Sequence, residues 1–104
     1  MEKLIITAAI TGSRITRKKA PYIPITPEEI VQSAIECRQA GASIVHIHVR
    51  DPKTGLGTQD LEIFKQVVDP LREKTDLVLC LTTSGIPGRN ISTEERLAPL
   101  ELNP

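Results

Sequence analysis

The amino-acid sequence predicts an α/β protein built on a parallel sheet. Three short apolar runs, "KLIITAAI", "SIVHIHV" and "DLVLCL", have the length and the branched side chains of buried strands. Segments with apolar residues at helical spacing separate these runs, and a third helix signal follows the last one. The βαβαβα order favours parallel strands joined by right-handed crossovers, either in an open doubly wound sheet or in part of a barrel.

The first strand is expected within residues 3–10, and it is predicted to be buried on both faces because its apolar run is continuous. Residues 11–25 contain glycine, serine, two prolines and a basic segment without any periodicity, which predicts a long loop. Loops of this length in compact domains are usually functional or disordered.

The first helix is predicted to begin after Thr26. Thr26 and Glu29 have the spacing of a capping box, and Pro27 occupies the first helical position, where proline is tolerated. Gly41 is a plausible stop. The expected inward-facing residues are Ile30, Val31, Ala34 and Ile35.

The rest of the chain repeats this alternation. Residues 43–49 are expected to form the second strand, residues 52–58 a loop, and residues 76–81 a third buried strand. Between them, apolar residues from Leu61 to Leu71 predict a second helix that Pro70 kinks or ends. Ser92 and Glu95 have the capping-box spacing again, which predicts a short third helix.

Charge and composition exclude some classes of partner. Thirteen basic and thirteen acidic residues give a net charge of zero, and the chain has one Tyr, one Phe and no Trp. We therefore expect neither nucleic-acid nor membrane binding. The N-terminal apolar run is far shorter than a membrane span, so we expect a cytoplasmic protein. Cys37 and Cys80 form no CxxC motif and lie in apolar surroundings, which predicts two buried, reduced thiols.

His46 and His48 are candidate metal ligands. Residues i and i+2 of a strand point to the same face about 6.6 Å apart, and imidazoles at that separation can converge on one metal with bonds of about 2.0 to 2.1 Å. Spacing alone leaves open two core histidines, each satisfied by a hydrogen bond. A catalytic zinc needs a third protein ligand. Asp51 has the opposite parity and an adjacent possible ion-pair partner, Arg50, so we expect it to be an orienting or structural group.

The carboxyl ends of the other two strands carry polar residues that could bind a substrate. Thr82 and Thr83 offer hydroxyl groups, and Gly85 lets a backbone N–H approach a ligand, although an ordinary polar turn has the same composition. Arg14 could pair with a carboxylate or simply be solvated. Neither the GxGxxG nor the GxxxxGK[ST] fingerprint of nucleotide binding is present.

Three parallel strands with three helices leave both sheet edges exposed, so we expect these residues to be the front part of something larger. The stretches "LIITAAITGS", "PITPEEI", "AGASIVHIHVRDPKTG", "TTSG" and "RLAPLELNP" together resemble the N-terminal third of the β-keto acid cleavage enzymes, typified by 3-keto-5-aminohexanoate cleavage enzyme. The resemblance covers essentially the whole chain. It implies a (β/α)8 TIM barrel, with residues 1–104 forming the N-terminal part of a single barrel domain and its first three βα units.

The resemblance also implies an activity. Enzymes of this family condense a β-keto acid with acetyl-CoA and release acetoacetate and a new CoA thioester, with the keto group bound by a divalent metal, normally zinc. The motif histidines fall on His46 and His48 as zinc ligands. A substrate-contacting serine of the family falls on Thr82, which keeps a hydroxyl group, and a substrate-contacting glycine falls on Gly85. The third ligand, a glutamate, and the catalytic aspartate are expected outside residues 1–104, so we expect this piece alone to be inactive. A homo-oligomer is also expected.

At one position the sequence departs from the pattern of the aminohexanoate enzyme. Arg14 stands where that enzyme has an acidic residue that meets the substrate amino group. A cation at this position should repel an amino-bearing substrate and favour a neutral or carboxylate-bearing β-keto acid. Two rival interpretations stay open from the sequence: a small non-enzymatic α/β binding domain with a buried histidine pair, and another metal-dependent barrel enzyme that shares the histidines.

Overall fold

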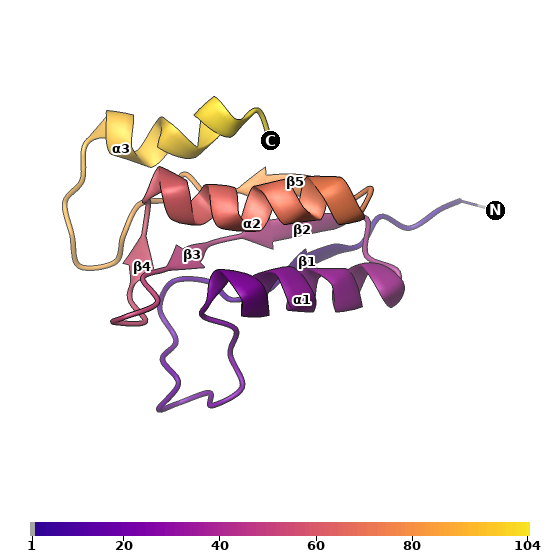
Figure 1. The fold of residues 1–104 in the computed structure, drawn as a ribbon, viewed down its shortest axis with the longest axis horizontal. Coiled ribbons are helices and arrows are strands. Elements are labelled where there is room, and N and C mark those ends of the chain that lie inside the picture. Colours follow the sequence, from indigo (N-terminus) through magenta and orange to yellow (C-terminus); the bar gives the residue numbers. More distant parts are fainter. Residues whose placement is uncertain (1) are drawn as a thin grey trace.

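The computed structural model describes residues 2–104 and contains a parallel sheet, two long helices and a small antiparallel ribbon (Figure 1). In chain order the elements are β1 (Thr7–Ala9), α1 (Pro27–Gln39), β2 (Ile44–Ile47), β3 (Val49–Arg50), β4 (Gly57–Thr58), α2 (Leu61–Lys74), β5 (Val78–Leu81), α3 (Thr93–Leu97) and the 3-10 helix η1 (Ala98–Leu102). The main sheet has the strand order β1-β2-β5, and both of its pairings are parallel. The predicted α/β class with parallel strands is confirmed.

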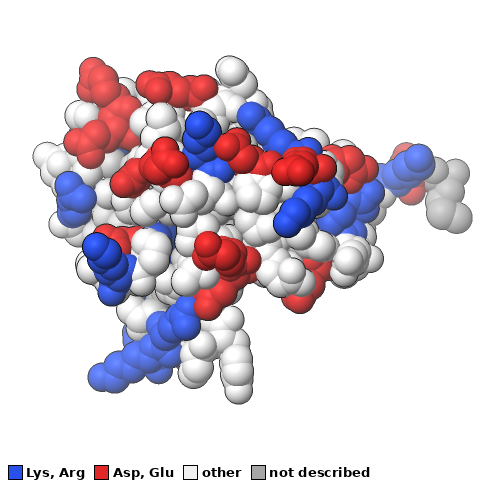
Figure 2. Space-filling model, viewed as in Figure 1, with Lys and Arg blue, Asp and Glu red and all other residues white. Residues whose placement is uncertain are grey.

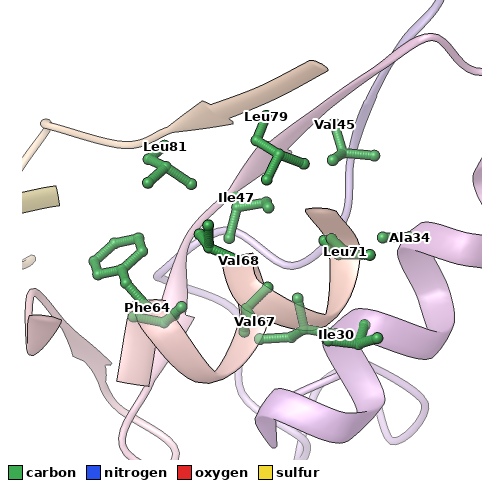
Figure 3. Packing of buried hydrophobic residues seen from close by; sticks show 12 residues of the cluster. Ile30, Ala34, Val45, Ile47, Phe64, Val67, Val68, Leu71, Leu79 and Leu81 are labelled. Carbon is green, nitrogen blue, oxygen red and sulfur yellow. The ribbon is translucent and has the colours of Figure 1, made fainter. Parts of the chain in front are cut away.

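Helices α1 and α2 pack against each other and cover one face of this sheet (Figure 1). Side chains at alternate strand positions, such as Val45 and Ile47 on β2, point into the layer between sheet and helices, where Phe64 and Leu71 of α2 and Ile30 of α1 meet them (Figure 3). All five of these side chains are fully buried. Burying a side chain of this size contributes about 1.5 to 3 kcal/mol, so this layer is the main source of stability.

The opposite face of the sheet is not covered by any part of the chain that the structure describes. Val78 and Cys80 of β5 are exposed on it, and the segment leading into β1 exposes Leu4 at 83% and Ile5 at 71%. The prediction that the first strand is buried on both faces is therefore wrong, and the predicted third buried strand is buried only at alternate positions, because the two long helices lie on a single side. The prediction of two buried thiols is also wrong, since Cys37 is half-buried and Cys80 is exposed.

The helix boundaries follow the predicted caps, with one exception. Thr26 and Glu29 form the complete capping box of α1, and the Ser92 hydroxyl accepts a hydrogen bond from the Glu95 N–H at the start of α3. Pro70 does not end α2, which continues to Lys74. The fully buried Leu71 packs in the core within this last turn, so tertiary packing outweighs the local cost of the proline.

The second predicted strand is divided in two. β2 ends at Ile47, and after His48 the chain continues as β3, which pairs antiparallel with β4. The predicted loop 52–58 thus contains a strand at its end, and residues 49–58 form a hairpin. His48 lies at the junction between the parallel sheet and this hairpin.

The long loop between β1 and α1 contains no helix or strand, as predicted. Its ends are joined by the Thr11 hydroxyl, which donates to the carbonyl oxygen of Pro24 over 2.6 Å. Figure 2 shows basic side chains gathered at its tip, whereas acidic and basic side chains are mixed over the rest of that face. Within residues 2–104, none of the helices has the length and apolar character needed to cross a membrane.

Candidate metal and substrate site

The rings of His46 and His48 converge on the uncovered face of the sheet. Their Nε2 atoms are 3.2 Å apart, and the ring centroids are 5.0 Å apart with the planes inclined at 78°. His46 is held in the middle strand, in register with Ala9 of β1 and Cys80 of β5. The convergence expected from the two-residue spacing is therefore present, although His48 itself lies just beyond the end of β2.

The spacing of the two Nε2 atoms fits a shared metal ion. Two ligands of a tetrahedral zinc with bonds of 2.0 to 2.1 Å lie about 3.3 Å apart, close to the 3.2 Å between these atoms. Residues 2–104 hold no group of three or more His, Cys, Asp or Glu side chains arranged to bind a metal. The described residues therefore offer two candidate nitrogen ligands, and a complete zinc site would need a further protein ligand from elsewhere.

The surroundings of His48 favour its uncharged form. The pKa of His48 is lowered, mainly because partial burial penalises the charged ring and also because His46 and Arg50 repel an added positive charge. On the other side of the pair, the Sγ atom of Cys80 lies 3.3 Å from Nδ1 of His46. Sequence reasoning missed this contact, because it depends on the register between two strands that are far apart in the chain.

Arg50 does not pair with Asp51. It is 1% exposed, and its guanidinium donates hydrogen bonds to the carbonyl oxygens of Gly12 at 2.8 Å, Gly55 at 2.9 Å and Thr11 at 3.3 Å. Burial lowers the pKa of this guanidinium. The Asp51 carboxylate instead accepts the backbone N–H of Lys53 within the hairpin. The suggested Arg50–Asp51 ion pair is thus wrong, while a structural role for Asp51 agrees with its bond inside the turn.

Arg14 and Gly85 line the same cavity. Together with Ser13, Ser84 and two other residues of the loop after β5, they line a cavity of about 210 Å³. A neighbouring groove of about 500 Å³ also includes Arg14 and extends along the hairpin to Asp51. Loops that follow two different strands of the sheet therefore meet at Arg14, as expected for the carboxyl ends of parallel strands.

The two threonines directly follow β5. Thr82 is 3% exposed, and its hydroxyl is 2.9 Å from the Ser84 hydroxyl and accepts the Ser84 backbone N–H at 3.2 Å. Thr83 accepts a hydrogen bond from Arg96 on its carbonyl oxygen. Within residues 2–104, no hydrogen bond or ion pair connects the histidine pair with Arg14, Thr82, Thr83 or Gly85. The structure thus places His46 beside His48. Arg14 and Gly85 line one cavity, and neither Thr82 nor Thr83 is among the residues lining it.

Fold and site together define a parallel α/β protein with two features at the carboxyl ends of its strands. The central strand presents a histidine pair, and the loops after the two neighbouring strands form a cavity lined by Arg14 and Gly85. A family model described as beta-keto acid cleavage enzyme matches residues 3–104. The chain belongs to the β-keto acid cleavage enzyme family.

Individual relatives agree with this assignment. The chain is 46% identical to a 3-keto-5-aminohexanoate cleavage enzyme from Fusobacterium nucleatum, with all of this chain and 38% of the relative covered. It is 40% identical to a 3,5-dioxohexanoate:acetyl-CoA acetone transferase from Paraburkholderia graminis, covering 93% of this chain and 31% of the relative. It is 36% identical to a 3-oxoadipate:acetyl-CoA acetyltransferase from Cupriavidus necator, covering 96% and 34%. The chain thus spans about a third of the length of these relatives.

Proposed function

We propose that the protein containing this chain is a zinc-dependent β-keto acid cleavage enzyme. It would condense a β-keto acid with acetyl-CoA to give acetoacetate and a new acyl-CoA, as a cytoplasmic homo-oligomer. Family membership supports the reaction class, and the names of the relatives supply acetyl-CoA and β-keto acids as substrates. The observation that carries the metal assignment is the 3.2 Å separation of the His46 and His48 Nε2 atoms.

We also propose that residues 1–104 form the N-terminal part of a single (β/α)8 barrel. Both long helices lie on one side of the sheet, as in a barrel wall, whereas a doubly wound sheet has helices on both sides. The histidines and the loops after β1 and β5 occupy the face and the strand ends that would line the barrel mouth. The third zinc ligand would come from a part of the barrel outside residues 1–104.

In this proposal His46 and His48 hold the metal, which polarises the substrate carbonyl as a Lewis acid when bound. Arg14 would bind a substrate carboxylate, and the backbone of Gly85 would approach the same molecule, because both line one cavity. Thr82 and Thr83 are proposed to supply hydroxyl groups. Since the Thr82 hydroxyl is bonded to Ser84, a substrate that binds Thr82 has to replace or extend this hydrogen bond.

The zinc assignment is tested by the metal content of the complete protein and of a His46→Ala, His48→Ala double variant. We expect the double variant to lose affinity for zinc by much more than about tenfold, because even residues that only orient ligands cost 10- to 100-fold when removed. The exposed Lys65 on α2 provides a control, Lys65→Ala, that should keep its zinc. Undiminished zinc binding in the double variant would refute the assignment.

The specificity assignment is tested at Arg14. A dicarboxylic β-keto acid should have a higher kcat/KM than an amino-bearing one, and Arg14→Glu should reverse the order. For the dicarboxylic substrate, kcat/KM should be at least about tenfold lower in Arg14→Glu than in the native protein, because a hydrogen bond to a charged group contributes about 1.5 to 3 kcal/mol. Lys18→Glu makes the same charge change in the same loop and should leave the preference unaltered. A native preference for the amino-bearing substrate would contradict the proposal.

A further inference from the structure

The two ring nitrogens of His46 have different partners. Nε2 faces His48 at 3.2 Å, and Nδ1 lies 3.3 Å from the Cys80 sulfur. From this geometry we propose that Cys80 is a positioning residue of the metal site, whose sulfur accepts the Nδ1–H of His46 and thereby leaves Nε2 free to bind the metal. This inference rests on the zinc site proposed above and assigns it a residue that is not itself a ligand.

The argument begins with the chemistry of a neutral imidazole. Such a ring carries one N–H, on either Nδ1 or Nε2, and an acceptor placed at one nitrogen retains the proton there. Metal-binding histidines are commonly fixed in this way. The ring nitrogen that does not bind the metal donates its N–H to a nearby acceptor. A thiol sulfur is a weak acceptor, but it lies within hydrogen-bond distance of Nδ1.

The sheet register places Cys80 beside His46. In the parallel pairing His46 lies opposite Cys80 of β5 on one side and opposite Ala9 of β1 on the other. Ala9 has only a methyl group, so within this row Cys80 carries the polar atom that can reach the ring. Both neighbours are fixed by backbone hydrogen bonds of the sheet, so the sulfur needs no mobile loop to reach its position.

The same geometry argues that Cys80 is not a third ligand. A metal bound by Nε2 of His46 would lie beyond that atom, in a direction that diverges from Nδ1, whereas the Cys80 sulfur is against Nδ1. A cysteine near a histidine pair could bind the metal or orient one of the rings, and the position of Cys80 against Nδ1 favours the second role. Replacing the sulfur by another acceptor should preserve the site, whereas removing the acceptor should weaken it.

The experiment compares Cys80→Ala and Cys80→Ser in the complete protein. Zinc affinity, measured by competition with a chelator, should fall about 10- to 100-fold in Cys80→Ala, as for other residues that orient ligands. Cys80→Ser keeps an acceptor and should stay near the native affinity. Cys37→Ala, in the half-buried cysteine of α1, is the matched control and should also bind normally. Native affinity in Cys80→Ala, or equal loss in both variants at position 80, would overturn the inference.

A second measurement does not depend on metal binding. Nitrogen NMR of metal-free, histidine-labelled protein at a pH where the rings are neutral should show the proton of His46 on Nδ1, with the signal assigned by its loss in His46→Ala. In Cys80→Ala the proton should shift toward Nε2. A native ring already protonated on Nε2 would overturn the inference even if zinc binds. Failure of the zinc proposal itself would instead appear as native protein without zinc affinity.

Discussion

Arg50 links two segments of the chain, the residues that follow β1 and the hairpin of residues 49–58. It is the largest of the fully buried side chains, and its hydrogen bonds reach the end of β1 through Thr11 and Gly12 and the hairpin through Gly55. Neither of the two ion pairs within residues 2–104 includes it. Its charge is therefore stabilised by carbonyl oxygens, and Arg50 fixes the loop that carries Arg14 relative to the hairpin.

Replacing Arg50 by methionine should destabilise the complete protein strongly. Methionine has a similar length but no donor, so three carbonyl oxygens lose their partner at a cost of about 1 to 3 kcal/mol for each that stays buried. We expect a loss of about 3 kcal/mol or more in the free energy of unfolding, measured by urea denaturation. Arg89→Met changes an exposed arginine and should stay within about 0.5 kcal/mol of native. Similar midpoints for both variants would show that the Arg50 bonds contribute little.

Residue roles could be predicted only where a local pattern determines them. The convergence of His46 and His48 follows from alternation along one strand, and it was predictable. The sequence suggested Asp51 as an ion-pair partner of Arg50, because the burial of Arg50 depends on the loop after β1 meeting the hairpin in space. The contact of Cys80 with His46 was equally hidden, since its two residues are 34 positions apart and only the sheet register brings them together.

Helix α1 shows how one carboxylate stabilises the start of an element. The Oε2 atom of Glu29 accepts the backbone N–H groups of Ile25 at 2.8 Å and Thr26 at 3.1 Å, and the Arg17 guanidinium at 2.6 Å. The pKa of Glu29 is lowered, above all by the hydrogen bond from Ile25, and also by those from Thr26 and Arg17. The ionised carboxylate is therefore favoured by folding.

Glu29→Gln should weaken α1 in a pH-dependent way. Because the folded pKa lies below the ordinary 4.5, the contribution of Glu29 is complete above that value and is lost as the pH falls through the folded pKa. At neutral pH we expect the variant to lose about 1 kcal/mol, the usual net value of such a hydrogen bond, with the difference shrinking in acid. Urea midpoints at several pH values measure this.

Glu28→Gln is the control, because Glu28 is in the same first turn and exposed. It should lose only the interaction with the helix dipole, about 0.3 to 1 kcal/mol at most. A difference between Glu29→Gln and native protein that stays constant down to strongly acidic pH would contradict the role given to the ionised carboxylate.

The elements themselves were predictable to different degrees. Capping signals at Thr26 and Ser92 located helix starts because they act within one turn. The division of the second strand after Ile47 was not predictable, because β3 and β4 contain two residues each, too few to show alternation. The continuation of α2 past Pro70 depends on the burial of Leu71 in the core, which the local sequence does not reveal.

At the scale of the whole molecule, the sheet has one packed face and one bare face. The apolar runs of β1 and β5 suggested strands covered on both sides, yet α1 and α2 cover only the side of Val45 and Ile47. The bare side holds the histidine pair and Cys80. The sequence therefore indicated the fold class correctly, but it did not show which faces of the sheet are covered. The apolar run of a strand does not determine whether another element packs on its second face.

The hydrogen bonds of Arg50 also limit the order in which contacts can form during synthesis of the chain. The capping box of α1 is complete once a few neighbouring residues have left the ribosome, but the bond from Arg50 to Gly12 joins groups 38 residues apart. A link of this length has to offset the entropy of closing a long loop and cannot exist before residue 50 has been synthesised. The loop that carries Arg14 is synthesised first, but its hydrogen bond to Arg50 can form only after the hairpin has been made.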